Sequence, residues 1–196
     1  MTVRGALFFT GAGAAAALAL LAGTPERARA GFPDAPPPAH TGGFGEPTCR
    51  ACHFDGELNE EGGGLTLGGV PAAYRPGERY RITVTLRRGE MKRGGFELAA
   101  RFTEGAAPGR QAGSLRAVDE RVRVTEGTRS GVQYATQARP GVQLTEAGRI
   151  EWVVEWTAPA AAAGPVVFHA AANAANGDES QFGDLVYTAT QTARAP

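Results

Sequence analysis

Apolar and polar residues alternate with a period of two in three stretches of the chain, residues 80–86, 96–102 and 150–156. In the last of these, Ile150, Trp152, Val154 and Trp156 are separated by polar residues or valine. A period of two is typical of a β-strand with one buried face, because successive side chains point to opposite sides of a sheet. We therefore predict three half-buried strands, with both tryptophans in the core.

Five further stretches have a weaker strand pattern: residues 113–118, 121–125, 132–136, 166–171 and 185–191. Gly, Pro and Asn separate the stretches, and none of them has the 3.6-residue period of an amphipathic helix. Many short strands at roughly ten-residue spacing are typical of a sandwich. The pattern predicts an all-β fold, an antiparallel β-sandwich over residues 65–191, with a tail at 192–196.

The first thirty residues have the pattern of a secretory signal peptide. Arg4 precedes an apolar stretch from Ala6 to Ala22, and Ala28-Arg29-Ala30 offers a small-residue cleavage site. An uncleaved membrane anchor is the alternative, but the apolar run is shorter than the roughly 20 residues that span a bilayer. We therefore expect export to the periplasm or the medium, with no membrane span after cleavage.

Charge then excludes some partners. The full chain has 20 basic and 20 acidic residues, and removal of residues 1–30 leaves 17 basic and 19 acidic ones. A protein with this balance lacks the positive charge that nucleic acids attract, so we expect no nucleic-acid partner.

Residues 31–64 are rich in Pro and Gly and contain the most informative motif of the chain, C-x-x-C-H at Cys49, Cys52 and His53. A short helical turn starting at Pro47 would place both thiols on one side. This spacing is the sequence form of c-type haem attachment, with two thioether bonds and the following His as proximal iron ligand. The chain has only these two cysteines and three histidines.

Other interpretations of the motif remain open. In an oxidising compartment Cys49 and Cys52 can form a disulfide. A thioredoxin-like redox pair needs a βαβ context, which the strand pattern does not offer. A zinc site would need Cys49, Cys52, His53 and one further His. The haem interpretation is favoured, with haem c as the expected cofactor.

The second axial ligand of the iron has three candidates, Met91, His40 and His169. Met91 lies in a turn between two predicted strands, where we expect it to be exposed. His40 precedes His53 by thirteen residues, and the glycine-rich chain between them can fold back. His169 lies in a strand on the face opposite Phe168, which favours an ordinary hydrogen-bonded histidine.

An acidic, amide-rich loop is the other polar cluster: Asn173, Asn176, Asp178, Glu179 and Asp184. Its oxygens are of the kind that bind calcium, although such clusters more often cap turns. No serine lies in a nucleophile elbow, and no phosphate-binding loop is present. We therefore expect no catalytic residues.

Several segments together resemble the bacterial choice-of-anchor V domain, which is related to the reelin (reeler) domain. The resemblance covers about Pro37 to Thr190 and rests on residues 40–49, 52–54, 95–98, 156–159 and 173–178. It implies an immunoglobulin-like sandwich on a secreted or surface protein, with Cys49 and Cys52 carrying the thioethers and His53 as axial ligand. Members of that family typically continue into a C-terminal anchoring signal. The residues up to Pro196 contain none, which favours a free periplasmic or secreted protein.

The sequence thus predicts an exported monohaem c-type cytochrome-like protein that transfers electrons or senses a redox partner or ligand. The alternative is an extracellular reeler-like binding or adhesion module in which a Cys49–Cys52 disulfide closes a loop and no haem is bound. In both cases the partner is unidentified, and we expect a carrier or binding module rather than an enzyme.

Overall fold

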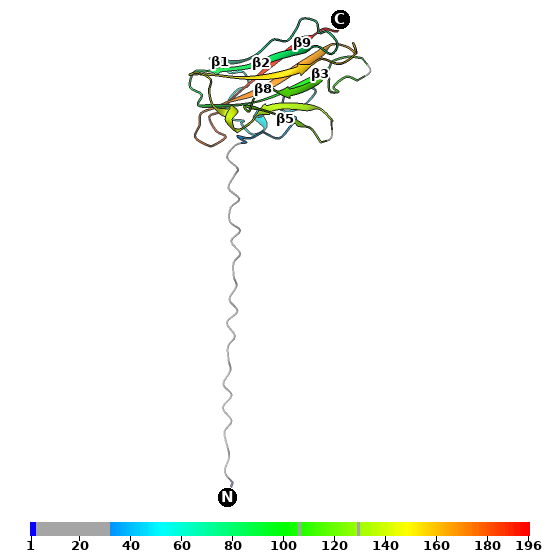
Figure 1. The fold of residues 1–196 in the computed structure, drawn as a ribbon. Helices are drawn as coiled ribbons and strands as arrows, with labels where there is room; N and C mark the ends of the chain where they lie inside the picture. The colour runs from blue at the N-terminus through cyan, green and yellow to red at the C-terminus, as the bar shows by residue number, and fades with distance from the viewer. Residues whose placement is uncertain (3–31, 106, 129) are drawn as a thin grey trace.

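The computed structural model describes residues 1–2, 32–105, 107–128 and 130–196 (Figure 1). The predicted signal peptide and its cleavage site therefore lie outside the described residues, apart from the first two. The described chain contains two short 3-10 helices and nine strands: η1 (Cys49–Ala51), β1 (Gly63–Gly68), β2 (Arg79–Arg88), β3 (Arg93–Phe102), β4 (Ser114–Ala117), β5 (Val122–Glu126), β6 (Gln133–Gln137), η2 (Arg139–Val142), β7 (Arg149–Thr157), β8 (Val166–Ala175) and β9 (Leu185–Ala193).

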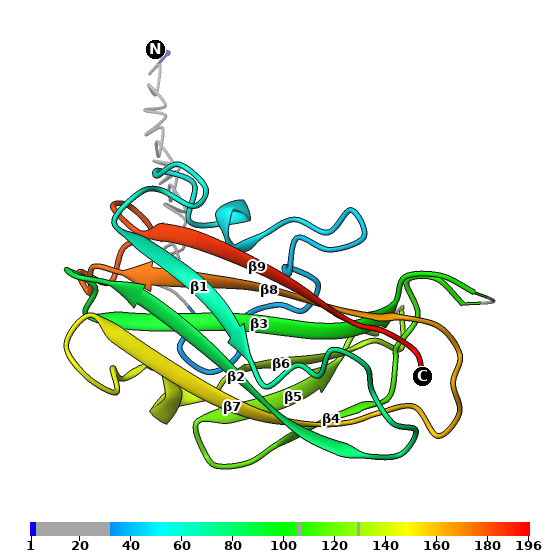
Figure 2. The ribbon, with the colours of Figure 1, turned by 90° about the horizontal axis from the view of Figure 1, so that it is seen from above.

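The strands form two antiparallel sheets packed as a sandwich (Figure 2). One sheet has four strands in the order β1-β2-β7-β4, and the other has five in the order β5-β6-β3-β8-β9. The central pairs are long, with Arg79 to Arg87 of β2 facing Thr157 to Arg149 of β7. The predicted all-β sandwich is therefore confirmed.

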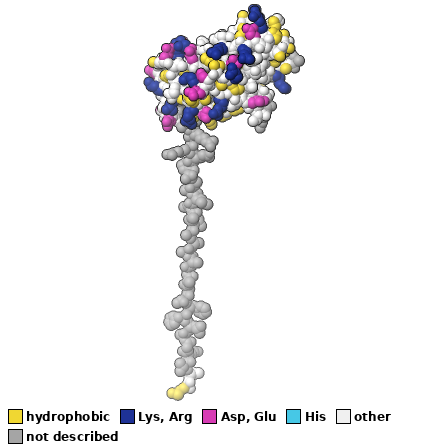
Figure 3. All heavy atoms as spheres, in the orientation of Figure 1, with side chains coloured by type: hydrophobic (Ala, Val, Ile, Leu, Met, Phe, Trp, Pro, Cys, Tyr) yellow, Lys and Arg dark blue, Asp and Glu magenta, His cyan; other side chains and the backbone are white. Residues whose placement is uncertain are grey.

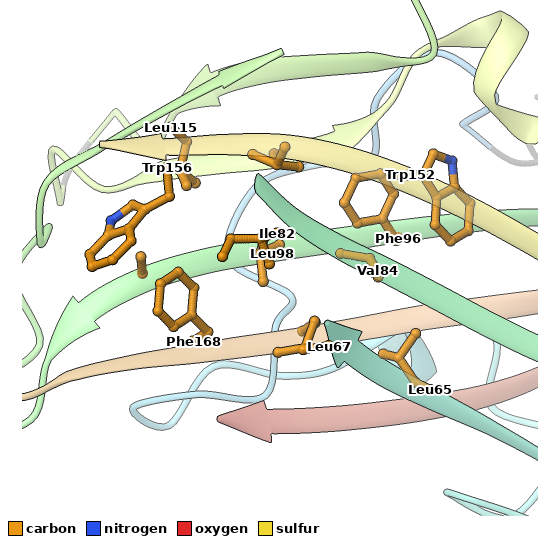
Figure 4. Packing of buried hydrophobic residues seen from close by; sticks show 14 of the residues in the cluster. Leu65, Leu67, Ile82, Val84, Phe96, Leu98, Leu115, Trp152, Trp156 and Phe168 are labelled. Carbon is orange, nitrogen blue, oxygen red and sulfur yellow. The ribbon is translucent and has the colours of Figure 1, made fainter. Parts of the chain in front are cut away.

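The core lies between the sheets and is built from the alternating apolar positions (Figure 4). Trp152 stacks on Phe96 with ring centroids 4.5 Å apart, and Trp156 meets Phe168 edge-on at 4.9 Å. Each indole also donates a hydrogen bond to a backbone carbonyl, Trp152 to Gly141 at 2.7 Å and Trp156 to Ala112 at 2.9 Å. Both tryptophans are core residues, as the sequence predicts.

The outer face of the five-stranded sheet is also covered. Three of its outward-facing residues on β3, Glu97, Ala99 and Arg101, are buried. The cover is the segment of residues 32–56. Ala39 packs on the buried side chains of Ala99 and Tyr134.

A polar cluster fastens this segment to the sheet. The Glu46 carboxylate pairs with the Arg101 guanidinium and accepts hydrogen bonds from the hydroxyls of Tyr134 at 2.5 Å and Thr41 at 2.6 Å. Since Arg101 and Tyr134 belong to β3 and β6, a single loop carboxylate joins the segment to two strands of the sheet. This cluster holds the chain that leads to the C-x-x-C-H motif.

The sequence expectations differ from the structure at three points. Strand β1 begins two residues before the expected start of the sandwich, and β9 runs to Ala193 because it pairs with β8 to its end. The expectation that Met91 is exposed is wrong, because its turn packs against the core and leaves the side chain 4% exposed. All eight stretches predicted as strands correspond to β2–β9.

The visible surface mixes the two signs of charge. Figure 3 shows Lys and Arg side chains interspersed with Asp and Glu on one face. No helix among the described residues has both the length and the apolar character needed to cross a bilayer.

Candidate functional site

A cavity of about 450 Å³ lies where the N-terminal segment meets the outer face of the five-stranded sheet. Cys49, Cys52, His53 and His40 all line it, together with residues of β3, β8 and the loop between β8 and β9. A cavity of a few hundred Å³ with a few polar groups is typical of a small-molecule or cofactor site. The structure therefore brings the whole C-x-x-C-H motif and one candidate second ligand to a single site.

The motif begins on a single helical turn, η1, as the sequence predicts. The Thr48 hydroxyl caps the turn by accepting a hydrogen bond from the Arg50 amide at 3.2 Å. The amides of Cys52 and His53 then both donate to the Cys49 carbonyl, at 3.2 and 3.0 Å. This turn places Cys49 and Cys52 one turn apart, with His53 directly after them.

His53 is held by a buried carboxylate. Its Nδ1 lies 2.8 Å from Oδ2 of Asp184, whose side chain is 1% exposed. A carboxylate accepts hydrogen bonds, so Nδ1 carries the proton and Nε2 keeps a free lone pair. The side-chain amide of Asn173 donates a hydrogen bond to the same carboxylate oxygen at 2.9 Å. The backbone amide of Asn176 donates one to Oδ1 of Asp184 at 3.0 Å. Metal-ligating histidines commonly have this kind of partner on the second nitrogen.

The two cysteines are free thiols, so the disulfide of the alternative interpretation is not formed. Cys49 is partly exposed as a residue, yet the protein around its sulfur raises the pKa of the thiol to about 12 by desolvation, with a further contribution from the Glu97 charge. Reactive redox cysteines have lowered pKa values. The surroundings of Cys49 therefore do not support a thioredoxin-like role.

Glu97 forms a buried part of the cavity wall. Its Oε1 accepts a hydrogen bond from the His40 amide at 2.7 Å, while its Oε2 has no partner among the described residues. Burial raises the pKa of this carboxyl to about 7, against the opposing effect of the backbone amides of His40 and Ala39. Asn173 Oδ1, on the same wall, is a second buried acceptor without a partner in the described chain.

Sequence reasoning missed Glu97 and the roles of Asp184 and Asn173. Glu97 alternates with Phe96 and Leu98, so its position in the pattern indicates a solvent-facing residue. Asp184 and Asn173 belong to the acidic loop singled out above. In that loop, Asn176 and Asp178 bond to one another and to nearby backbone, as turn-capping residues do. No group of three or more His, Cys, Asp or Glu side chains is arranged to hold a metal ion in the part of the chain that the structure describes.

The other two candidate second ligands lie elsewhere. Met91 belongs to the core and lines a separate cavity of about 270 Å³. His169 lies on the outer face of β8, where its ring packs against Gly43 and meets Phe44 edge-on at 5.5 Å. Desolvation, followed by the Arg101 charge, lowers the pKa of His169. Neither residue lines the cavity of the motif.

Comparison with known proteins gives likenesses in structure only. No family model matches the sequence, and no curated protein does. Among solved structures, the reelin-N domain of F-spondin is 22% identical, with a TM-score of 0.48 over 76% of this chain and 97% of that domain. A human F-spondin reeler domain is 23% identical, with a TM-score of 0.46 over 74% and 98%.

A third likeness is to the cohesin module of a Clostridium perfringens family 33 glycoside hydrolase. It is 14% identical, with a TM-score of 0.46 over 68% of this chain and 96% of the module. The reeler part of the resemblance stated from the sequence thus reappears among solved structures. At these identities and TM-scores the likenesses assign no activity.

Proposed function

We propose that this chain is an exported β-sandwich module that binds one haem covalently and acts as an electron carrier or redox sensor. Cys49 and Cys52 are the attachment points, and His53 is the proximal iron ligand. The observation that supports this most directly is the bond of 2.8 Å between His53 Nδ1 and buried Asp184, in a cavity lined by both cysteines. The sequence pattern of a signal peptide fits such a protein, since c-type attachment takes place outside the cytoplasm.

The residues present fit this group in three respects. The η1 turn presents two thiols on one side, and both are free to form thioethers. Asp184 fixes the tautomer of His53 so that Nε2 is the available ligand. The cavity beside them is within the size range of cofactor sites. When bound, haem supplies a one-electron couple whose potential depends on its axial ligands and their hydrogen bonds.

Asp184 and Asn173 have a supporting role in this proposal. Because Asp184 accepts bonds from Asn173, the Asn176 amide and His53, its orientation is fixed by three donors. A carboxylate held in this way fixes the orientation of the imidazole. The loop between β8 and β9 therefore positions the ligand that η1 carries.

A second candidate function rests on an exposed aromatic pair beside the motif. Phe54 and Phe182 pack edge-to-face with centroids 5.8 Å apart, and they are 50% and 53% exposed. Exposed apolar patches and aromatic residues are common features of protein-binding surfaces. An extracellular binding module without haem would use such a surface, and it remains the competing proposal.

Production of the full chain, with residues 1–30, in a bacterial host that matures c-type cytochromes separates the two. The haem proposal expects a coloured exported protein whose mass is that of the cleaved polypeptide plus one haem, with a pyridine haemochrome spectrum of thioether-linked haem. Replacing both Cys49 and Cys52 by Ala should abolish covalent haem. Replacing His53 by Ala should keep the thioethers but remove the low-spin Soret feature.

His169→Ala is the matched control, because it removes a histidine that does not line the cavity. This variant should retain both the haem and its spectrum. A colourless protein of unmodified polypeptide mass, obtained while a control cytochrome matures in the same cells, would overturn the haem proposal and favour the binding module.

A further inference from the structure

His40 shares the cavity of the C-x-x-C-H motif, and its position follows from the backbone. Thr41 and Thr48 form an antiparallel bridge, and the Gly42 amide donates to the Pro47 carbonyl at 2.9 Å. These contacts close residues 41–48 into a loop. In antiparallel pairing the next positions outward are His40 and Cys49, so the loop brings His40 beside the first cysteine of the motif.

The imidazole of His40 has the same tautomer as that of His53. Its Nδ1 lies 3.0 Å from the Pro37 carbonyl oxygen. A carbonyl oxygen only accepts hydrogen bonds, so Nδ1 carries the proton and Nε2 keeps its lone pair. A bond from Nδ1 to a backbone carbonyl is one of the usual arrangements of metal-ligating histidines. In the neutral form of each ring, both histidines of the cavity therefore have Nε2 available as a ligand.

Two contacts fix the backbone at His40. The buried Glu97 carboxylate accepts a hydrogen bond from the His40 amide at 2.7 Å, and this bond joins His40 to β3. Ala39, the residue before it, has a φ of 74° and packs on Ala99 and Tyr134. A positive φ is costly for alanine and persists only where the surroundings enforce it. The strained backbone of Ala39 and the buried carboxylate of Glu97 together therefore fix the position of this histidine.

We propose that His40 is the second axial ligand, so that His40 and His53 together provide a bis-histidine site, with Glu97 as a positioning residue. This inference rests on the proposed function, because it needs a haem held by Cys49 and Cys52. Met91 is excluded from the role by its burial in the core, and His169 by its packing against Gly43 outside the cavity.

The test is the spin state of the ferric protein, followed by electron paramagnetic resonance and absorption spectra. The wild type should be low-spin, with the spectrum of two nitrogen ligands. His40→Ala should convert most of the ferric haem to high spin while the mass still shows one haem. Added imidazole should restore the low-spin spectrum. His40→Gln, which keeps a polar side chain at the loop, should behave as His40→Ala does.

Met91→Leu and His169→Ala are the matched controls, and both should stay low-spin. A His40→Ala protein that remains low-spin without imidazole would overturn the inference, as would a high-spin wild type. Both of these results leave the proposed haem function intact, because haem is attached in each. A wild type that carries no haem under maturing conditions overturns the proposed function and this inference together.

Discussion

Replacing Glu97 by Gln should stabilise the folded protein above about pH 7 and have a smaller effect near pH 4. Glu97 is fully buried, and one of its carboxyl oxygens has no hydrogen-bond partner in the described chain. Ionisation therefore places a negative charge in a poorly solvated position. Glutamine keeps the shape and the acceptor for the His40 amide but cannot ionise.

The size of the effect follows from the change in pKa. Burial raises the pKa of Glu97 from 4.5 to about 7. In the wild type, the stability associated with the neutral carboxyl is fully present below pH 4.5 and is lost as the pH rises through 7, because the unfolded chain ionises first. A difference of this size corresponds to about 3 kcal/mol in the free energy of unfolding. Cys49 stays a neutral thiol over this range, since its pKa is about 12.

The assay is denaturant unfolding of both proteins, in the same haem state, from about pH 4 to pH 8. The stability of Glu97→Gln relative to wild type should rise by about 3 kcal/mol over this range, or by roughly 6–12 °C in Tm. Glu120→Gln, an exposed acid, is the matched control and should give a flat difference. A flat difference for Glu97→Gln as well would show that its carboxylate is solvated or paired when ionised, and would refute the reasoning.

Two further predictions concern the contacts around the motif. Gly43→Ala should destabilise the protein by about 1–3 kcal/mol, because a Cβ there would lie 2.5 Å from Cγ of His169. His169→Ala in the same chain should recover most of the loss in thermal unfolding, and independent additive effects would contradict the contact. Asp184→Asn should weaken the hold on His53 and shift the reduction potential of the haem protein in a redox titration, whereas Asp178→Asn, in the same loop but exposed, should leave it unchanged. Equal potentials for Asp184→Asn and wild type would show that the carboxylate does not act on the ligand.

Local patterns predicted the strands well, because a half-buried strand is encoded in the alternation itself. Strand β7 buries every second residue from Ile150 to Trp156, as its sequence indicates. Strand β1 was missed, since three of its six residues are glycine and carry no side-chain pattern. Met91 was misplaced for a different reason. The turn itself depends on neighbouring residues in the sequence, but its packing against the core depends on residues that are distant in the sequence.

The motif residues were also visible in the sequence, because the C-x-x-C-H pattern consists of Cys49, Cys52 and His53 at a fixed spacing. The residues that hold the motif by hydrogen bonds could not be identified from the sequence. Asp184 is 131 positions after His53 in the chain, and the fold joins them through the loop between β8 and β9. The choice among three candidate second ligands likewise depended on which residues the fold brings to one cavity.

Glu97 shows most clearly the difference between what the sequence determined and what the tertiary structure decided. The sequence by itself determined the class of fold, the position of the motif and the inward face of each strand, since all three depend on residues close in the chain. Alternation assigns Glu97 to the outward face of β3, and this assignment is correct. That the outward face is buried was decided only by the tertiary structure, in which residues 32–56 fold over the sheet and Glu46 pairs with Arg101. A period of two tells which side of a sheet a residue faces, but not what covers that side.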